Sequence, residues 1–233
     1  LLGADDDPGS FQPDHPLLRR AVHEHPDLRI GATDLLMDTL ACAVIEQRVT
    51  SSEAYGSIHD LVRHVGELAP GPAAQAGHPA SGMRVPLAAE QWASLPSWEY
   101  TRHGVDAHRA SALVGLARRF ASLRRALSQA DAPGRMRLLT GLPGVGVWTA
   151  AKVLQQVYGD PDAWSDGDYH VPGLLTTALT GHRSDNEACR VLLTRWPGHR
   201  YRVELLVGLA VGEQRRGPRR DLPKHVPGVG VNR

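Results

Sequence analysis

The spacing of apolar residues follows the period of an α-helix along most of the chain. Residues 32–48 place Leu36, Leu40, Ala43 and Val44 on one face, three or four positions apart. No run of strict apolar and polar alternation is long enough to predict a strand. The periodicity therefore predicts an all-α fold of about ten helices.

Local signals predict where several helices begin. Thr50 followed by Glu53 forms a capping box at the start of a helix over 51–67. Asp106 can cap the next long helix. The apolar stripe of that helix consists of Leu113, Leu116, Ala117, Phe120 and Leu123. Further helices are expected near 135–140, 147–157, 169–178, 185–194 and 199–213. Proline and glycine predict loops over Ala69–Pro86 and from Gly217 onward.

Composition excludes several classes of protein. The 233 residues are 42% apolar, which excludes a disordered chain and is enough to bury a core. The longest wholly apolar stretch, Leu40–Ile45, falls far short of the roughly 20 residues that a membrane span needs. Two cysteines, Cys42 and Cys189, are too few for a disulfide framework, a four-cysteine zinc site or an iron–sulfur cluster. We therefore expect a reducing, intracellular setting.

The two ends of the chain differ in charge. Residues 1–38 hold eight acids and three bases, whereas residues 195–233 hold nine bases and three acids. The basic segment suggests an anionic partner, although a solvated basic tail would give the same pattern. The chain begins Leu1-Leu2-Gly3, with neither a start methionine nor a signal-peptide pattern, so we expect its natural N-terminus to lie upstream.

The most informative segment is Leu-Pro-Gly-Val-Gly at 142–146, between two predicted helices. Pro143 restricts φ, while Gly144 and Gly146 permit positive φ and leave the backbone uncovered. Amides at a helix N-terminus favour a phosphate through hydrogen bonds and the helix dipole. A Rossmann phosphate loop is disfavoured because it needs a preceding strand and a third glycine. A plain glycine-rich connection between helices remains the alternative.

A carboxylate, Asp168, follows this segment at a spacing that bears on its function. Asp168 stands twenty residues after Trp148 and is followed by Tyr169. Taken alone, Asp168 could be a helix N-cap contributing about 1 kcal/mol. Together, the hairpin, the tryptophan and the Asp-Tyr pair resemble the helix-hairpin-helix DNA glycosylases, and in particular the 3-methyladenine DNA glycosylase II branch. The resemblance extends from about Asp14 to Pro218.

The resemblance implies two helical lobes with a DNA-binding cleft between them and the hairpin at their junction. The helical barrel lobe would be residues 35–158, including the hairpin. The second lobe would combine 12–34 with 159–216, and 217–233 would form a basic tail. In this family a damaged nucleotide swings out of the duplex, at a cost of a few kcal/mol that is lower for a damaged base.

The resemblance also implies roles for three side chains. Asp168 matches the catalytic aspartate, which stabilises positive charge on the sugar and guides water to C1′. Trp148 matches an aromatic of the base pocket, where a cationic purine stacks on the indole. Tyr169 matches a second pocket residue. Core packing for Trp148 and a place on the helix surface for Tyr169 are the structural alternatives.

At the hairpin, the resemblance implies that the amides of Gly144, Gly146 and Val147 hold a DNA phosphate and that Thr149 also contacts DNA. The hairpin carbonyls would offer a site for a monovalent cation. We expect no other cofactor and no catalytic metal. His23 and His25 flank Glu24, but no further ligand stands at metal spacing.

Three positions depart from the family's pattern. Gln47 and Arg48 are both expected to contact DNA. Arg48 stands where the residue that wedges into DNA is usually glutamine or leucine; it would otherwise be an arginine facing the dipole of its helix end. Lys152 lies one turn after Trp148, where alkylation-repair enzymes tend to have an aromatic, and is either solvated or reaches the pocket. His199 replaces a pocket tryptophan. A pocket with Lys152 and His199 is less suited to cationic purines.

Related bifunctional members carry a lysine where this chain has Trp148, so the resemblance implies a monofunctional enzyme. We expect a base-excision repair hydrolase that releases an alkylated purine, of the 3-methyladenine or 7-methylguanine type, from damaged double-stranded DNA. We expect it to be a monomer in the cytoplasm, associated with the nucleoid and not with membranes. The alternatives are a glycosylase for a different or bulkier lesion and a non-catalytic helix-hairpin-helix DNA-binding protein.

Overall fold

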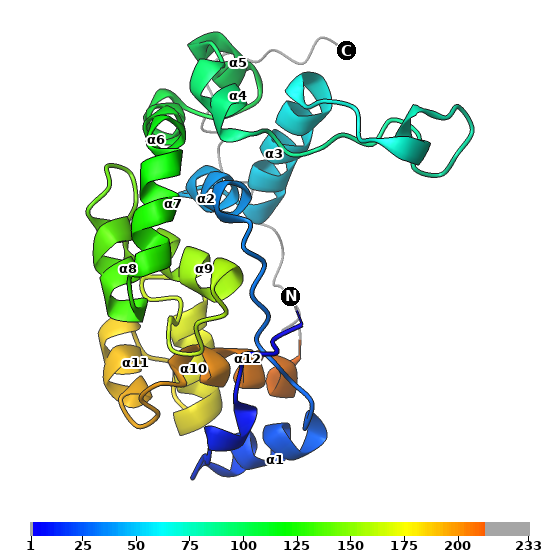
Figure 1. Cartoon of the computed structure of the whole chain (residues 1–233). Helices are drawn as coiled ribbons and strands as arrows, with labels where there is room; N and C mark the ends of the chain where they lie inside the picture. The colour runs from blue at the N-terminus through cyan, green and yellow to red at the C-terminus, as the bar shows by residue number, and fades with distance from the viewer. Residues whose placement is uncertain (1, 213–233) are drawn as a thin grey trace. The chain divides into compact units, whose positions relative to one another are not determined.

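A computed structural model describes residues 2–212, and the fold is all-α over that range, as the periodicity predicts (Figure 1). Its α-helices are α1 Pro16–Glu24, α2 Leu36–Ile45, α3 Ser51–Val65, α4 Ala89–Ser94, α5 Ser97–Arg102, α6 Ala107–Arg118, α7 Phe120–Gln129, α8 Ala132–Thr140, α9 Val147–Val157, α10 Val171–Thr180, α11 Asn186–Leu193 and α12 Arg200–Val211. Two short 3-10 helices are η1 Pro8–Ser10 and η2 Gly71–Ala74. Within the same range, no helix has both the length and the apolarity needed to cross a membrane.

The two helix starts that were predicted from capping residues are confirmed. The backbone N–H of Thr50 donates to Glu53 Oε2 at 2.9 Å, and the N–H of Glu53 donates to Thr50 Oγ1 at 3.3 Å. These bonds form the capping box at the start of α3. At the start of α6, Asp106 Oδ1 accepts from the backbone N–H of Arg109 at 2.9 Å. Both caps depend on residues three positions apart, which is why the sequence alone predicts them.

The prediction of one long helix after Asp106 is wrong, because the structure has two helices there, α6 and α7. The N–H of Arg119 donates to Leu116 O, three residues back, so the chain leaves the α-helical ladder between the two helices. The apolar stripe continues across the break, because Leu113, Leu116 and Leu123 are all buried. The helical spacing of buried residues therefore continues through the break, whereas the α-helical hydrogen bonds do not.

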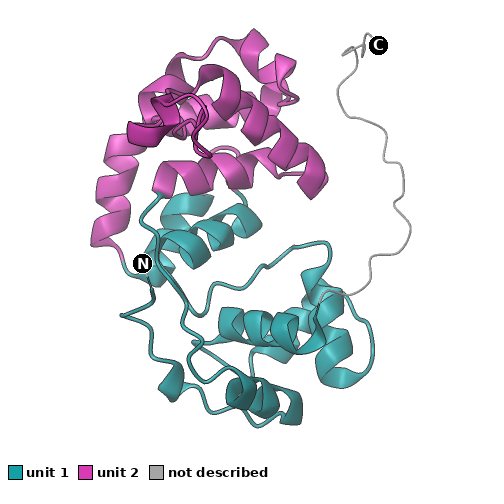
Figure 2. Ribbon diagram, turned by 90° about the vertical axis from the view of Figure 1, so that its right-hand side faces the viewer, with its two compact units in different colours: residues 1–35, 131–140, 146–221 teal, residues 36–130, 141–145, 222–233 magenta. Residues whose placement is uncertain are grey.

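The described residues divide into two compact units (Figure 2). Unit 2 contains Leu36–Ala130 and Gly141–Val145, and hence α2 to α7. In it, α6 packs against α2, α4 and α5. The predicted stripe of α2, which is Leu36, Leu40, Ala43 and Val44, is buried. The core of unit 2 thus forms around α2 and α6.

Unit 1 contains the residues up to Leu35, Asp131–Thr140 and the described residues from Gly146. In it, α1 and α10 pack against α12, and α8 packs against α9. Its buried cluster includes Phe11, Leu18, Trp164, Leu175, Leu193, Trp196 and Val203. Trp164 lies at the start of the loop that leads to α10, and its burial in this core anchors that end of the loop.

The grouping of two helices differs from the predicted lobes. Packing groups α8 and α9 with unit 1, whereas the resemblance places residues 131–158 in the barrel lobe. The turn Gly141–Val145 groups with unit 2. The predicted basic tail, 217–233, lies outside the described residues.

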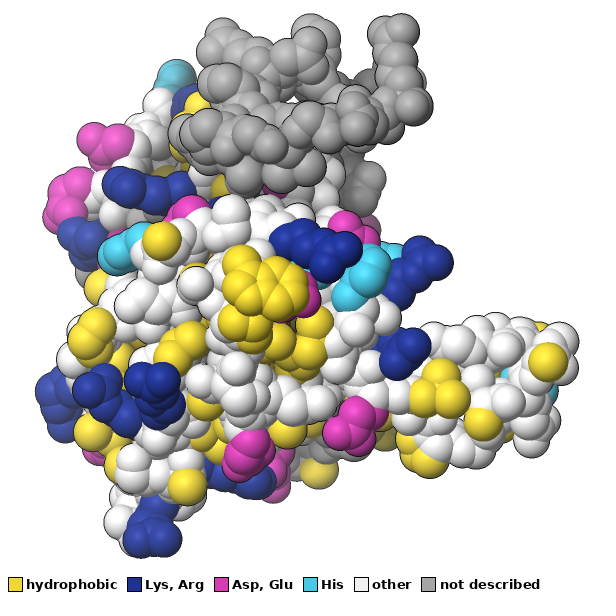
Figure 3. All heavy atoms as spheres, turned by 90° about the horizontal axis from the view of Figure 1, so that it is seen from above, with side chains coloured by type: hydrophobic (Ala, Val, Ile, Leu, Met, Phe, Trp, Pro, Cys, Tyr) yellow, Lys and Arg dark blue, Asp and Glu magenta, His cyan; other side chains and the backbone are white. Residues whose placement is uncertain are grey.

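The predicted loop Ala69–Pro86 forms an arm of unit 2 that contains η2 (Figure 1). An isolated bridge between Leu68 and Arg84 closes the base of the arm. Its residues 69–83 include no Asp, Glu, Lys or Arg, and Figure 3 shows an almost uncharged surface there. We therefore do not place the DNA contacts on this arm.

Candidate functional site

The turn between α8 and α9 has the features of an anion-binding hairpin. The N–H of Val145 donates to Leu142 O at 3.1 Å and closes the turn. Gly144 has φ +81°, and a β-carbon on it would overlap Cβ of Ala112. Gly146 caps α9 without a side chain, and Val147 is 49% exposed. Because the first amides of a helix have no acceptor within it, this turn offers donors to a phosphate.

Two hairpin carbonyls are already engaged. Gly144 O accepts a hydrogen bond from Gln47 Nε2 at 2.9 Å, and Leu142 O accepts from Val145. Each carbonyl oxygen has two lone pairs, so these bonds leave one on each oxygen for the monovalent cation that the resemblance implies. The bond from Gln47 ties the residues after α2 to the hairpin.

Substitution of Gly144 should show how strongly the turn depends on glycine. We expect Gly144→Ala to lower the free energy of unfolding by about 2 kcal/mol, since the left-handed backbone disfavours a β-carbon and Ala112 blocks it. In the same chain, Ala112→Gly should recover the steric part of that loss. Gly115→Ala, in α6 with no heavy atom within 4 Å of the new β-carbon, should instead stabilise the fold by about 0.5–1 kcal/mol. Urea unfolding measures all three, and equal effects at positions 144 and 115 would contradict the constraint.

Arg48 is exposed and has φ +60°, a conformation that a residue with a β-carbon rarely adopts. Arg109 supports this segment: its buried guanidinium donates to Ile45 O at 2.6 Å and to Asp106 Oδ2 at 2.7 Å. The end of α2 is therefore fixed by Arg109 and, through Gln47, by the hairpin. Arg109 was not predicted as a site residue, because nothing in the local sequence pattern shows that it reaches α2.

Asp168 lies half-buried in the loop before α10, and both of its oxygens accept hydrogen bonds. Oδ1 accepts from the backbone N–H of His170 at 2.7 Å and of Val171 at 3.0 Å. Oδ2 accepts from Trp148 Nε1 at 2.9 Å. Burial raises the pKa of the carboxyl, but the two amides, the indole and the charge of Lys152 outweigh it and hold the pKa below its usual range. Asp168 is therefore ionised at neutral pH, while also bonding the first amide of α10.

The loop that carries Asp168 is clamped by α11. Asp166 accepts from Asn186 Nδ2 at 2.8 Å and from Arg190 Nε at 3.2 Å. The N–H of Gly167 donates to Asn186 Oδ1 at 2.8 Å. Gly167 has φ +82°, so a glycine is needed where the loop turns toward Asp168. Asn186 and Arg190 were not predicted as site residues, because their partner Asp166 is distant in the sequence.

Lys152 is held next to Trp148 by a buried polar network. Its Nζ donates to Ser165 Oγ at 2.8 Å and lies 5.6 Å from the centroid of the Trp148 ring. Ser165 is fully buried, and its Oγ and N–H donate to the two oxygens of Glu204 at 2.7 and 2.8 Å. Burial raises the pKa of Glu204, and the charge of Lys152 opposes that shift. Lys152 is therefore not a solvated surface lysine.

Ser165 and Glu204 are further residues that the sequence analysis missed. One signal was available: Lys152 and Gln155 are polar residues three positions apart on α9, which is mostly apolar. Gln155 is buried, and its Nε2 donates to Ser165 Oγ at 3.1 Å. Two polar residues on one buried helix face indicate a shared polar partner.

The bond from Trp148 should be visible in the titration of Asp168. Because the folded-state pKa lies below the ordinary value of about 3.9, ionised Asp168 stabilises the fold above that pH, and this contribution is lost as pH falls through the folded pKa. Trp148→Phe removes the indole N–H, so the pKa of Asp168 should rise and the contribution should shrink. Carboxyl ¹³C NMR measures the midpoint. Trp98→Phe, at an exposed position on α5, should leave it unchanged, and an unmoved midpoint in Trp148→Phe would refute the coupling.

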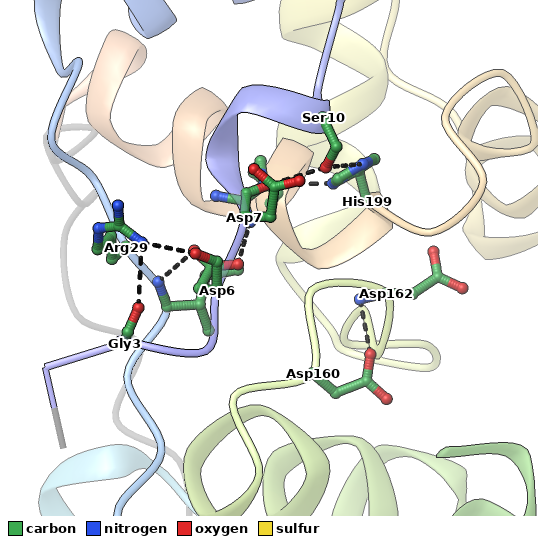
Figure 4. A network of polar contacts seen from close by, with 10 residues as sticks. Gly3, Asp6, Asp7, Ser10, Arg29, Asp160, Asp162 and His199 are labelled. Carbon is green, nitrogen blue, oxygen red and sulfur yellow. Dashed lines mark hydrogen bonds and ion pairs between the residues drawn. The ribbon is translucent and has the colours of Figure 1, made fainter. Parts of the chain in front are cut away.

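The remaining predicted residues lie in different surroundings. Tyr169, next to Asp168, is 85% exposed and contacts His170 edge-on, whereas Thr149 is buried. The side-chain contacts of His199 in the described part of the chain are with Ser10, Phe11 and Arg202, not with Trp148, Lys152 or Asp168. Its ring contacts the N-terminal segment, where Nε2 lies 3.4 Å from Ser10 Oγ (Figure 4).

Burial and the charge of Arg202 lower the pKa of His199, which favours its neutral form. Nδ1 accepts from Arg202 Nε at 3.3 Å, and the ring packs against Phe11 with centroids 5.0 Å apart. Arg202 is itself buried and paired with Asp6. These contacts indicate that His199 helps to hold the N-terminal segment on unit 1.

No protein-family model matches the sequence, and no curated protein matches it. Among solved structures, the fold is similar to that of a 3-methyladenine DNA-glycosylase from Archaeoglobus fulgidus, with 18% identity and a TM-score of 0.66, over 84% of this chain and 64% of that one. It is also similar to an 8-oxoguanine glycosylase/lyase from Clostridium acetobutylicum, with 13% identity and a TM-score of 0.66, over 82% of this chain and 65% of that one. A 3-methyladenine DNA glycosylase from Schizosaccharomyces pombe, in complex with abasic DNA, has 13% identity and a TM-score of 0.62, over 91% of this chain and 95% of that one.

The chain thus spans less than two thirds of the first two proteins and nearly all of the third. At these identities the similarity shows a common fold. The chain has the all-α fold of helix-hairpin-helix DNA glycosylases, as the sequence resemblance predicted.

Proposed function

We propose that this protein is a monofunctional DNA glycosylase, which hydrolyses the N-glycosidic bond of a flipped, alkylated purine in double-stranded DNA. The observation that carries the proposal is the ionised carboxylate of Asp168, half-buried beside the indole of Trp148. Two of the similar structures bear the name 3-methyladenine DNA glycosylase, and one was crystallised with abasic DNA, which supports this reaction and this partner. The hairpin would hold a phosphate of the bound strand through the amides of Gly144, Gly146 and Val147.

Asp168 suits charge stabilisation better than proton abstraction. When the bond between C1′ and the base breaks, its electron pair leaves with the base and positive charge develops on the sugar. A preorganised carboxylate next to C1′ lowers the energy of that state. Of roughly four acceptor positions on the carboxylate, three are occupied by Trp148, His170 and Val171, which leaves one for the sugar or the incoming water. A lowered pKa makes the group a weak base but keeps its charge at all physiological pH values.

The amines near the site favour hydrolysis over strand cleavage. Trp148 occupies the position where the resemblance would place a Schiff-base lysine in bifunctional enzymes. Lys152 is the nearby amine, and its Nζ is bonded to Ser165. We therefore expect no covalent adduct when the enzyme is treated with borohydride during turnover. We also propose that the enzyme acts as a monomer at the nucleoid.

The proposal is tested with duplex oligonucleotides that each contain one defined lesion. The set includes 7-methylguanine, 3-methyladenine, 1,N6-ethenoadenine, hypoxanthine and 8-oxoguanine, with an undamaged duplex as control. We expect abasic sites, revealed by alkali, in at least one duplex with an alkylated purine, and intact strands without alkali. Enzyme-independent depurination is subtracted from each rate. Absence of base release from every alkylated purine would refute the proposed function.

A further inference from the structure

The surroundings of Trp148 carry an inference that rests on the proposed function and narrows its substrate. We propose that Lys152 makes the site select uncharged alkylated purines with free acceptor atoms over cationic ones. The observations are the placement of its ammonium beside the indole and the buried network that keeps it there.

The ammonium is fixed and not mobile in solvent. Nζ donates to Ser165 Oγ at 2.8 Å, and Ser165 is fully buried. Ser165 is anchored in turn by two hydrogen bonds to the carboxylate of Glu204. A lysine side chain held at one end by such a network keeps its charge within 5.6 Å of the centroid of Trp148.

A fixed ammonium changes what the indole can bind. An indole attracts a cation through the negative face of its ring, and here Lys152 already lies within the range of that attraction. A cationic purine stacked on Trp148 would meet a like charge a few ångströms away, in a half-buried site where repulsion is stronger than in water. The charge of Asp168 does not restore a preference for cationic purines. It stabilises the positive charge that develops on the sugar, which is the same for both kinds of substrate.

The same ammonium favours departure of an uncharged base. A cationic purine leaves as a neutral molecule, whereas an uncharged purine takes the electron pair of the broken bond and leaves with negative charge. Of the three N–H groups of Nζ, one is bonded to Ser165, which leaves two for acceptors such as purine N7. The water that bonds to C1′ loses a proton to solvent, and the departing base gains one from solvent, so the step balances. Lys152 therefore stabilises one class of leaving group and repels the other.

The test compares single-turnover release of 1,N6-ethenoadenine, which is uncharged and has a free N7, with that of 7-methylguanine, which is cationic and methylated at N7. For each lesion, the rate enhancement is the enzymatic rate divided by the spontaneous rate of base loss. We expect the wild-type protein to show a larger rate enhancement for ethenoadenine than for 7-methylguanine. Lys152→Met should shift the ratio of the two rates at least tenfold toward 7-methylguanine. Lys152→Arg keeps the charge and should shift the ratio less than about threefold.

Lys152→Met removes the charge that opposes the effect of burial on Glu204, so a second variant controls for loss of folding. The double variant Lys152→Met with Glu204→Gln removes both charges and keeps the hydrogen bonds to Ser165 possible; thermal melting shows whether it folds, and it should show the same shift in ratio. Base release with an unchanged ratio in the folded variants would overturn this inference and leave the proposed function intact. Absence of release of any alkylated purine by the wild-type protein would overturn both.

Discussion

Asp168→Asn should reduce the single-turnover rate of base release by about 10³-fold, or about 4 kcal/mol of transition-state stabilisation. Asparagine keeps the size of the side chain and one oxygen that can accept from the amides of His170 and Val171. It lacks the negative charge that opposes the developing cation on the sugar. Affinity for a duplex with a stable abasic analogue should change by less than about threefold, because the hairpin contacts are untouched.

A matched control separates catalysis from helix capping. Asp185 Oδ1 accepts from the backbone N–H of Ala188 at 2.9 Å at the start of α11, so its carboxylate has the capping role of Asp168 without the neighbouring indole. Asp185→Asn should lower stability by less than about 1 kcal/mol and leave base release unchanged. Asp168→Asn should cost more stability than this control, because its amide nitrogen cannot accept from the indole N–H of Trp148. If Asp168→Asn released bases at the wild-type rate, Asp168 would be only a cap. If neither wild type nor variant released any base, the protein would be a non-catalytic DNA-binding module.

The parts of the fold that the sequence predicted are those that depend on near neighbours. The capping box of Thr50 and Glu53 and the buried stripe of α2 involve residues three or four positions apart, and both are confirmed. The break at Arg119 was not predicted, because the apolar stripe on both sides of it keeps the helical period. Which helices pack together is set by contacts between distant segments, and no local pattern encodes them.

The candidate site shows the same division. Asp168 and Trp148 stand out because their spacing from the hairpin is a sequence pattern, and the indole does bond the carboxylate. Glu204 lies 39 residues from Ser165 and has the sequence signature of an ordinary helix-surface glutamate. The structure shows that it accepts from Ser165, which also accepts from Lys152. The resemblance placed His199 in the pocket, whereas its ring contacts Ser10 and Phe11 of the N-terminal segment.

The second large effect should come from Arg48→Gly, in which activity and stability are expected to move in opposite directions. We propose that the exposed guanidinium fills the gap left by the flipped nucleotide. Flipping costs a few kcal/mol, so loss of a side chain that offsets about 2–3 kcal/mol of it should slow base release about 30- to 150-fold. The backbone at φ +60° suits glycine better than arginine, so the free energy of unfolding should stay the same or rise by up to about 1 kcal/mol.

Two further substitutions separate the effect of the backbone conformation at position 48 from the effect of the guanidinium group. Arg48→Asn keeps a residue that tolerates the left-handed conformation and lacks the guanidinium, so it should lose base release as Arg48→Gly does. Arg48→Lys keeps the charge and length and should retain at least a tenth of the wild-type rate. Fluorescence of 2-aminopurine placed next to the lesion reports flipping directly and should rise on binding of wild type but not of Arg48→Gly. If Arg48→Gly flipped and released bases at the wild-type rate, the arginine at this strained position would have no role in DNA, and the end of α2 would be only a helix terminus.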